Sequence, residues 1–178
     1  MINSRLEKTK VKMINNEYEV ISKYYFGKVT SENVPYINHI NEGLDILGYI
    51  DASELTQAAF CLHPIFQSNN DWSENQYNEI DLSLCNPWAI ALAVEYRNVA
   101  NFYLSKTGYD SKIIHLLNQA RPEIKDMLIA DKIQNYKDMF KYNRHRANFN
   151  LLEDYFQKWF NILNIDENRK GELIGVIT

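Results

Sequence analysis

Two histidines and one aspartate, each in a recognisable local setting, have side chains that allow metal chemistry: His39, His63 and Asp131. Two imidazoles and one carboxylate are the minimum ligand set for a hard or borderline divalent cation. All three lie in segments with helical hydrophobic periodicity, so the packing of separate helices must bring them to one point. The alternative is a buried cluster without metal, in which Asp131 accepts hydrogen bonds from one or both imidazoles.

The elements that would position these side chains are helices. Only six glycines and four prolines interrupt the chain, and the apolar residues between them recur at helical rather than alternating spacing. We predict an all-α bundle of about seven to eight helices that forms one domain over residues 1–165 and ends in a loose tail at 166–178. The expected helices cover residues 11–26, 37–47, 55–66, 87–105, 113–120, 122–135 and 147–163, and residues 68–86 form a long irregular loop.

Local patterns support two of the helices that carry the candidate ligands. Residues 51–54 (DASE) have the spacing of a capping box immediately before the helix that carries His63. In the helix that begins at Pro122, Asp131 falls on the same inward-facing row as Leu128. A carboxylate buried in that row needs a partner.

Composition restricts the classes of partner. The formal net charge of −4 provides no basic excess for a phosphate backbone, so we exclude general nucleic-acid binding. No run approaches the roughly 18 uninterrupted apolar residues of a membrane span, and the N-terminus has no apolar signal region. The two cysteines, Cys61 and Cys85, lie in or beside apolar stretches, so we expect them to fill the core of a soluble cytoplasmic protein.

Five segments carry a resemblance to one family. Residues 35–39 (PYINH) are similar to a PYI-x-H motif, 58–63 (AAFCLH) to AALLH, 96–100 (YRNVA) to the stretch around an FRK-type arginine, 128–135 (LIADKIQN) to LADRLHN or LADKLYN, and 154–159 (DYFQKW) to YFEWA. In this order and at comparable separations, they resemble the HD-type hydrolase domain of the RelA/SpoT family and its short metazoan relatives. The resemblance extends over residues 18–163.

The resemblance implies an HD-domain-like fold. It also implies the activity of that family, which removes the 3′-pyrophosphate of guanosine tetraphosphate with one Mn(II) ion. It places His39 and His63 as the first two metal ligands and Asp131 as the last. A purine nucleotide such as guanosine tetraphosphate is then the expected partner. The candidates for binding it are Arg97, Lys132 and Asn135.

The sequence departs from the family at the catalytic positions. Pro64 stands where the HD motif has its aspartate, and Gln67 with Ser68 replaces the Glu-Asp pair credited with activating the attacking water. Neither an amide nor a hydroxyl acts as a general base near neutral pH. We therefore expect a degenerate domain, a pseudoenzyme, with little or no hydrolase activity that retains at most a nucleotide or metal pocket. The catalytic candidates that are left are Gln67 and Asp71.

Two other functions are compatible with the sequence. One is an active metal-dependent nucleotide phosphohydrolase in which Asp71 or Glu74 supplies the missing carboxylate. The other is a helical interaction module that uses the 68–87 loop and a basic segment, whose cationic residues are Lys132, Lys137, Lys141, Arg144, His145 and Arg146. The sequence leaves open whether the cofactor is Mn(II), another divalent metal such as Fe(II) or Zn(II), or none.

Overall fold

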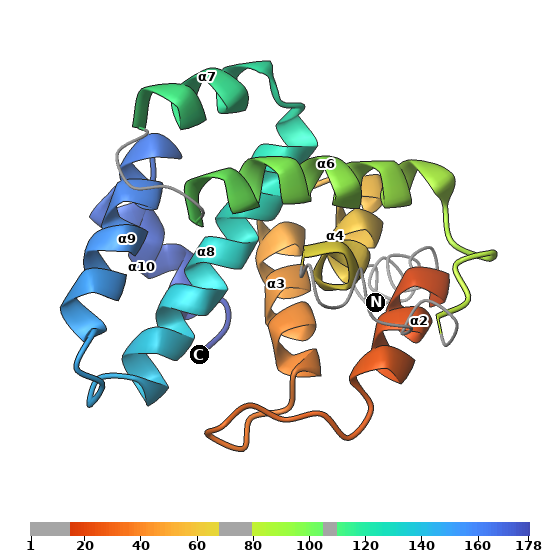
Figure 1. Ribbon diagram of the computed structural model, residues 1–178, viewed down its shortest axis with the longest axis horizontal. Coiled ribbons are helices and arrows are strands. Elements are labelled where there is room, and N and C mark those ends of the chain that lie inside the picture. The colour runs from red at the N-terminus through yellow and green to blue at the C-terminus, as the bar shows by residue number, and fades with distance from the viewer. Residues whose placement is uncertain (1–14, 68–79, 105–109) are drawn as a thin grey trace, which may run out of the picture.

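Helices make up the regular structure of this chain. The computed structural model describes residues 15–67, 80–104 and 110–178, and over these ranges it contains eight helices and no strand (Figure 1). The prediction of an all-α bundle of seven to eight helices is confirmed. The helices are α2 (Asn15–Tyr25), α3 (Ile37–Tyr49), α4 (Glu54–Gln67), α6 (Pro87–Leu104), α7 (Asp110–Gln119), α8 (Pro122–Tyr142), α9 (Phe149–Ile162) and α10 (Glu167–Gly175).

Helix α4 lies at the centre of the bundle. It packs against α2, α3, α6 and α8, and α6 crosses over both α4 and α8 (Figure 1). Most of α4 is therefore buried, from Thr56 to Phe66. The helix begins at Glu54, close to the predicted start, but its N-cap is Ser53 and not the first residue of the predicted capping box, Asp51: the hydroxyl of Ser53 accepts a hydrogen bond from the backbone N–H of Thr56 at 3.1 Å.

Helix α8 is the longest described helix and connects the two sides of the bundle. It begins at Pro122, as predicted, and packs against α3, α4 and α6 on one side and against α9 and α10 on the other. Because both sides are covered, several polar side chains of α8 are buried along with its apolar ones. Asp131, Lys132 and Gln134 are 2%, 3% and 1% exposed. Buried polar groups of this kind must be satisfied by neighbours.

A close approach between α3 and α4 brings the two histidine-bearing helices together. Gly43, buried on α3, faces the ring of Phe60 on α4, and a Cβ atom at position 43 would overlap that ring. Phe60 in turn contacts both histidines, with ring centroids 5.7 Å from His39 and 4.6 Å from His63. Because Gly43 has no side chain, α3 and α4 can approach closely, and this approach helps to set the distance between the two imidazoles.

The C-terminal segment corrects one prediction. A loose tail is expected over residues 166–178, but Glu167–Gly175 form α10, which packs against α8. The carboxylate of Asp166 caps the helix by accepting from the N–H of Arg169 at 2.7 Å, and Leu173 is 1% exposed. The segment is polar overall, so its few apolar anchors do not produce a helical pattern strong enough to predict.

The structure tests the predicted first helix and the predicted 68–86 loop only in part. Residues 11–14 of the first predicted helix, and residues 68–79 of the predicted loop, lie outside the described residues. The part of the loop that is described, from residue 80 to the start of α6, contains no helix or strand. Among the helices of the described ranges, none combines the length and apolar character that crossing a bilayer requires.

Candidate metal centre

The three predicted ligands converge on one point. The Nε2 atoms of His39 on α3 and His63 on α4 lie 3.2 Å apart, and Oδ1 of Asp131 on α8 lies 3.5 Å and 3.9 Å from them. The geometric prediction that three separate helices bring these side chains together therefore holds. Bonds of about 2.0–2.2 Å to one ion would separate neighbouring ligand atoms by about 3.0–3.5 Å, which is close to the separations observed.

Helix α8 determines which nitrogen of His39 carries the proton. The Nε2 amide group of Gln134 donates to Glu42 at 2.9 Å and to Asp138 at 2.7 Å, so its Oε1 atom is left to face Nδ1 of His39 at 2.6 Å. An amide oxygen only accepts, so Nδ1 must be the donor. In neutral His39 the lone pair is consequently on Nε2, which points at the centre of the cluster.

The backbone of α4 has the same effect on His63. Nδ1 of His63 lies 2.6 Å from the carbonyl oxygen of Phe60, which can only accept, so Nδ1 is again the donor and Nε2 carries the lone pair. His63 is 0% exposed, and burial, followed by the proximity of His39, lowers the pKa of His63 to about 3. The imidazole is therefore neutral at physiological pH.

The chemistry of this donor set fits a cation. Two nitrogen lone pairs and a carboxylate oxygen face one another, and two acceptors 3.2 Å apart repel unless a proton or a metal ion lies between them. His39, His63 and Asp131 are the residues that would hold a divalent metal, with open coordination positions on the pocket side. Their role as metal ligands stays a prediction.

Asp131 is stabilised as a carboxylate by its neighbours on α8. Lys132 Nζ donates to Oδ2 at 2.7 Å, and Asn135 Nδ2 donates to Oδ1 at 2.8 Å. Burial alone would raise the pKa of Asp131, but Lys132 and the two imidazoles outweigh burial and hold that pKa well below its usual value. The same pairing raises the pKa of Lys132, although burial opposes it.

Two of the substrate-binding candidates, Lys132 and Asn135, lie beside Asp131. Lys132 and Asn135 both border the pocket, but their polar ends contact Asp131. The ammonium of Lys132 also lies over the ring of Trp159, 5.1 Å from its centroid, which further fixes its position. The observed interactions make both residues supports of the third ligand; direct contact with a substrate stays a prediction.

A pocket of about 380 Å³ opens onto the cluster. His39 connects the two, because its side chain is 19% exposed whereas those of His63 and Asp131 are 1% and 3% exposed. Tyr25 and Tyr36 line the pocket with stacked rings whose centroids are 5.4 Å apart. The pocket thus offers one imidazole edge and an aromatic surface to a ligand.

The remaining catalytic and substrate-binding candidates differ in their position relative to this pocket. Gln67 lines the pocket at the end of α4, and its carbonyl accepts from Asn101 at 2.8 Å. Arg97, half-buried on α6, is not among the described residues that line this pocket. Asp71, together with Ser68 and Glu74, lies outside the described residues.

The basic segment does not form one open patch. Lys132 is buried against Asp131, Lys137 donates to Glu42 and Asp138, and Arg146 pairs with Glu32. Opposite charges therefore neutralise these three cationic residues, whereas Lys141, Arg144 and His145 are exposed.

No motif in the sequence singles out Gln134 or Tyr96, although both contact histidines of the candidate metal centre. Gln134 lies one helical turn after Asp131, a spacing that places both on one face of α8 and that could have suggested a supporting role. Tyr96 is 0% exposed, and its ring meets that of His63 edge-on at 5.0 Å. Its hydroxyl makes no hydrogen bond of ordinary geometry with the described residues, and burial, followed by the nearby Asp131 carboxylate, raises the pKa of Tyr96 well above its usual value.

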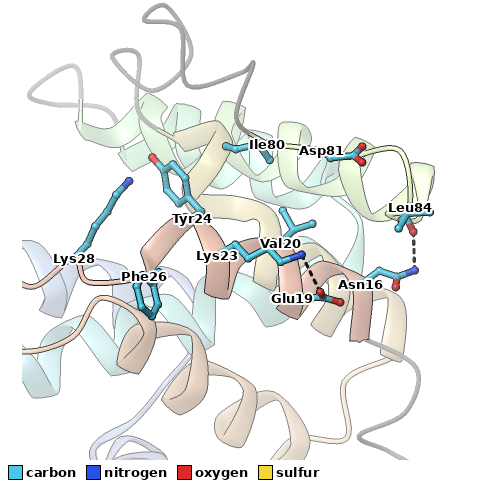
Figure 2. Close-up of a pocket in the computed structure, with 10 residues that line it drawn as sticks. All are labelled: Asn16, Glu19, Val20, Lys23, Tyr24, Phe26, Lys28, Ile80, Asp81 and Leu84. Carbon is cyan, nitrogen blue, oxygen red and sulfur yellow. Dashed lines mark hydrogen bonds and ion pairs between the residues drawn. The ribbon is translucent and has the colours of Figure 1, made fainter.

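A second pocket, of about 520 Å³, lies between α2 and the segment that precedes α6 (Figure 2). Two pairs of its polar groups are engaged with each other: Lys23 pairs with Glu19 at 2.8 Å, and Asn16 donates to the carbonyl of Leu84 at 2.8 Å. Its described lining includes no imidazole or thiol. The chemistry needed for metal binding is therefore found at the pocket beside His39.

Comparisons with known proteins give no independent assignment, since no protein-family model, no curated protein and no solved structure matches this chain. The kinship with the RelA/SpoT family stays a prediction.

Proposed function

We propose that this chain is a divalent-cation-binding domain of the HD type, related to the guanosine tetraphosphate hydrolases, with little or no hydrolase activity. The observation that supports it most strongly is the convergence of three acceptor atoms, from His39, His63 and Asp131, with the Nδ1 proton of each imidazole directed away from the centre. Such an arrangement is stable when a cation accepts all three lone pairs.

The charges in the pocket favour an anionic ligand for the loaded site. Both imidazoles are neutral ligands, and Lys132 already balances the negative charge of Asp131. Nearby, Lys137 offsets one of the two carboxylates of Glu42 and Asp138, so a divalent cation would leave about one uncompensated positive charge beside the pocket, which a phosphate group can neutralise. The metal would supply Lewis acidity toward a phosphate oxygen. A purine nucleotide bearing a pyrophosphate, with its base against Tyr25 and Tyr36, fits this chemistry.

The described residues that line the pocket do not supply a general base. Gln67 is an amide, and the carboxylates among the described lining residues are Asp131 and Asp138. Asp131 is held by Lys132 and Asn135, and Asp138 accepts from Gln134 and lies 3.1 Å from Lys137. The partners of Asp131 lower its pKa, so it is a poor acceptor for the proton of an attacking water, and the carboxylate oxygens of Asp138 are already engaged by its neighbours. We therefore propose binding without efficient hydrolysis.

A metal titration tests the binding. Protein freed of metal with chelator is titrated with Zn(II) and with Mn(II), and we expect one equivalent of each to bind, Zn(II) more tightly because two of the three donors are imidazoles. His39→Ala should weaken binding by roughly 100-fold or more, since it removes a ligand outright. His115→Ala, at an exposed histidine of α7, is the matched control and should have no effect. Equal binding by both variants would contradict the proposal.

A turnover assay tests the loss of hydrolysis. With guanosine tetraphosphate and either metal, we expect pyrophosphate to be released no faster than in buffer without protein. The nucleotide should nevertheless raise the melting temperature of the metal-loaded protein. Turnover at the rate of an intact family enzyme would show that the chain is an active hydrolase instead.

The sequence also leaves two alternative functions: the hydrolase that uses Asp71 or Glu74, and the interaction module. Both depend largely on residues outside the described ranges, and no described contact favours either.

A further inference from the structure

Pro64 lies inside helix α4, directly after the candidate ligand His63. In a regular α-helix the N–H of residue 64 donates to the carbonyl oxygen of residue 60. Proline has no N–H, so this bond cannot form, and the ring also pushes against that carbonyl. The carbonyl of Phe60 therefore lacks its usual helical donor.

That same carbonyl is the hydrogen-bond partner of His63. Nδ1 of His63 donates to it at 2.6 Å, and both residues as a whole are 0% exposed. A buried carbonyl deprived of its helical donor needs another, and a buried imidazole N–H needs an acceptor. The two requirements are met by one bond within a single turn of α4.

This bond orients the ligand atom. With the proton on Nδ1, the lone pair of His63 is on Nε2, which faces Nε2 of His39 at 3.2 Å and Oδ1 of Asp131 at 3.9 Å. If residue 64 carried an N–H, it would compete for the Phe60 carbonyl from the helical direction. The proton of His63 could then move to Nε2 and donate to Asp131, which would block the nitrogen that the metal requires.

We propose that Pro64 is a positioning residue: by freeing the Phe60 carbonyl, it holds His63 in the tautomer that presents Nε2 to the metal. At this position the RelA/SpoT-type motif has an aspartate ligand, so the residue that removes one ligand also orients another. The consequence for metal affinity rests on the proposed function. The consequence for the tautomer does not.

The variant Pro64→Ala tests the proposal, because alanine restores the N–H with little change in volume. In metal-free protein with ¹⁵N-labelled histidine, long-range ¹H–¹⁵N spectra report which nitrogen of His63 is protonated. We expect the Nδ1–H form in the wild type and a large fraction of the Nε2–H form in Pro64→Ala. Zn(II) affinity should fall about tenfold, the lower end of what loss of such a supporting contact costs.

The melting temperature is a second readout. If Pro64 had only a structural role, its replacement would not raise the melting temperature and weaken metal binding at the same time. Removing a proline from a helix interior should raise the melting temperature of the metal-free protein, while metal affinity falls. Pro87→Ala is the matched control, since Pro87 occupies the first position of α6, where no helical N–H bond is lost, and it should change neither the tautomer nor the affinity.

An unchanged Nδ1–H tautomer in Pro64→Ala would overturn the proposal, whatever happens to stability. If the wild type binds no metal but the tautomer shifts in Pro64→Ala, the proposed function fails and the role of Pro64 stands. If metal binds and the tautomer does not shift, the opposite holds.

Discussion

Lys132 and Asp131, adjacent in the sequence, form a buried ion pair in which Nζ of Lys132 lies 2.7 Å from Oδ2 of Asp131. The two side chains are 4% and 3% exposed. Adjacent residues of a helix normally point in different directions, but the long lysine side chain turns back to the carboxylate beneath the rings of α9. The candidate metal ligand is thus already paired with one cation.

Replacing Lys132 with methionine should destabilise the metal-free protein by about 3–5 kcal/mol, because Asp131 is left buried without its counter-charge. Urea unfolding in the presence of chelator measures the loss. Lys158→Met, at an exposed lysine on α9, is the control and should change stability by less than about 0.5 kcal/mol. Equal unfolding midpoints for the two variants would show that the pair contributes little.

Divalent metal should restore part of that stability in Lys132→Met. The metal would replace the ammonium as the counter-charge of Asp131, so Zn(II) should raise the unfolding midpoint of this variant more than that of the wild type. Thermal unfolding with and without Zn(II) measures the difference. A smaller effect in the variant would mean that Lys132 supports the metal rather than competes with it.

Gln134→Met should weaken metal binding about 10–100-fold while the fold is retained. Methionine has a similar volume but offers no amide oxygen to Nδ1 of His39, so the tautomer of His39 is no longer determined. Zn(II) titration measures the change, and Gln119→Met on α7 is an exposed control. Unchanged affinity would indicate that the contact to His39 is dispensable.

Gly43→Ala should destabilise the protein by about 1–3 kcal/mol, because the new Cβ atom overlaps the Phe60 ring and forces α3 and α4 apart. The same displacement should weaken Zn(II) binding, since Phe60 contacts both imidazoles. Gly48→Ala on the same helix is the control: nothing lies within 4 Å of its added Cβ, and alanine favours the helix there. Equal stability of the two variants would contradict the close approach of α3 and α4.

The two cysteines should react slowly with alkylating reagents in the folded protein. Burial, assisted by the nearby Glu17, raises the pKa of Cys85 to about 11 and that of Cys61 still further. At pH 8 the thiolate fraction of Cys85 is then more than about 100-fold below that of an ordinary thiol, and it should grow about tenfold with each pH unit below its pKa. Iodoacetamide labelling with and without urea measures this. Rapid labelling at pH 8 without urea would show that the thiols are accessible.

Local rules account for the parts of the fold that were predictable. The start of α4 and the start of α8 at Pro122 depend on groups only a few residues apart. The C-terminal helix α10 was not predictable although Asp166 is a cap, because a cap alone does not establish a helix when few apolar residues follow it. Packing of Leu173 against the bundle stabilises that helix, and packing partners are not visible in a local pattern.

By itself the sequence determined the helical class of this protein, the three residues whose side chains can bind a metal and the absence of a helical N–H at Pro64, because each follows from spacing or from covalent structure. Tertiary structure alone decided that the three side chains meet, that Gln134 orients His39 across 95 positions, and that Lys132 neutralises Asp131. The physical reason is that hydrogen-bond direction and charge pairing depend on which helix faces are in contact, and only the packing of the whole chain determines those contacts.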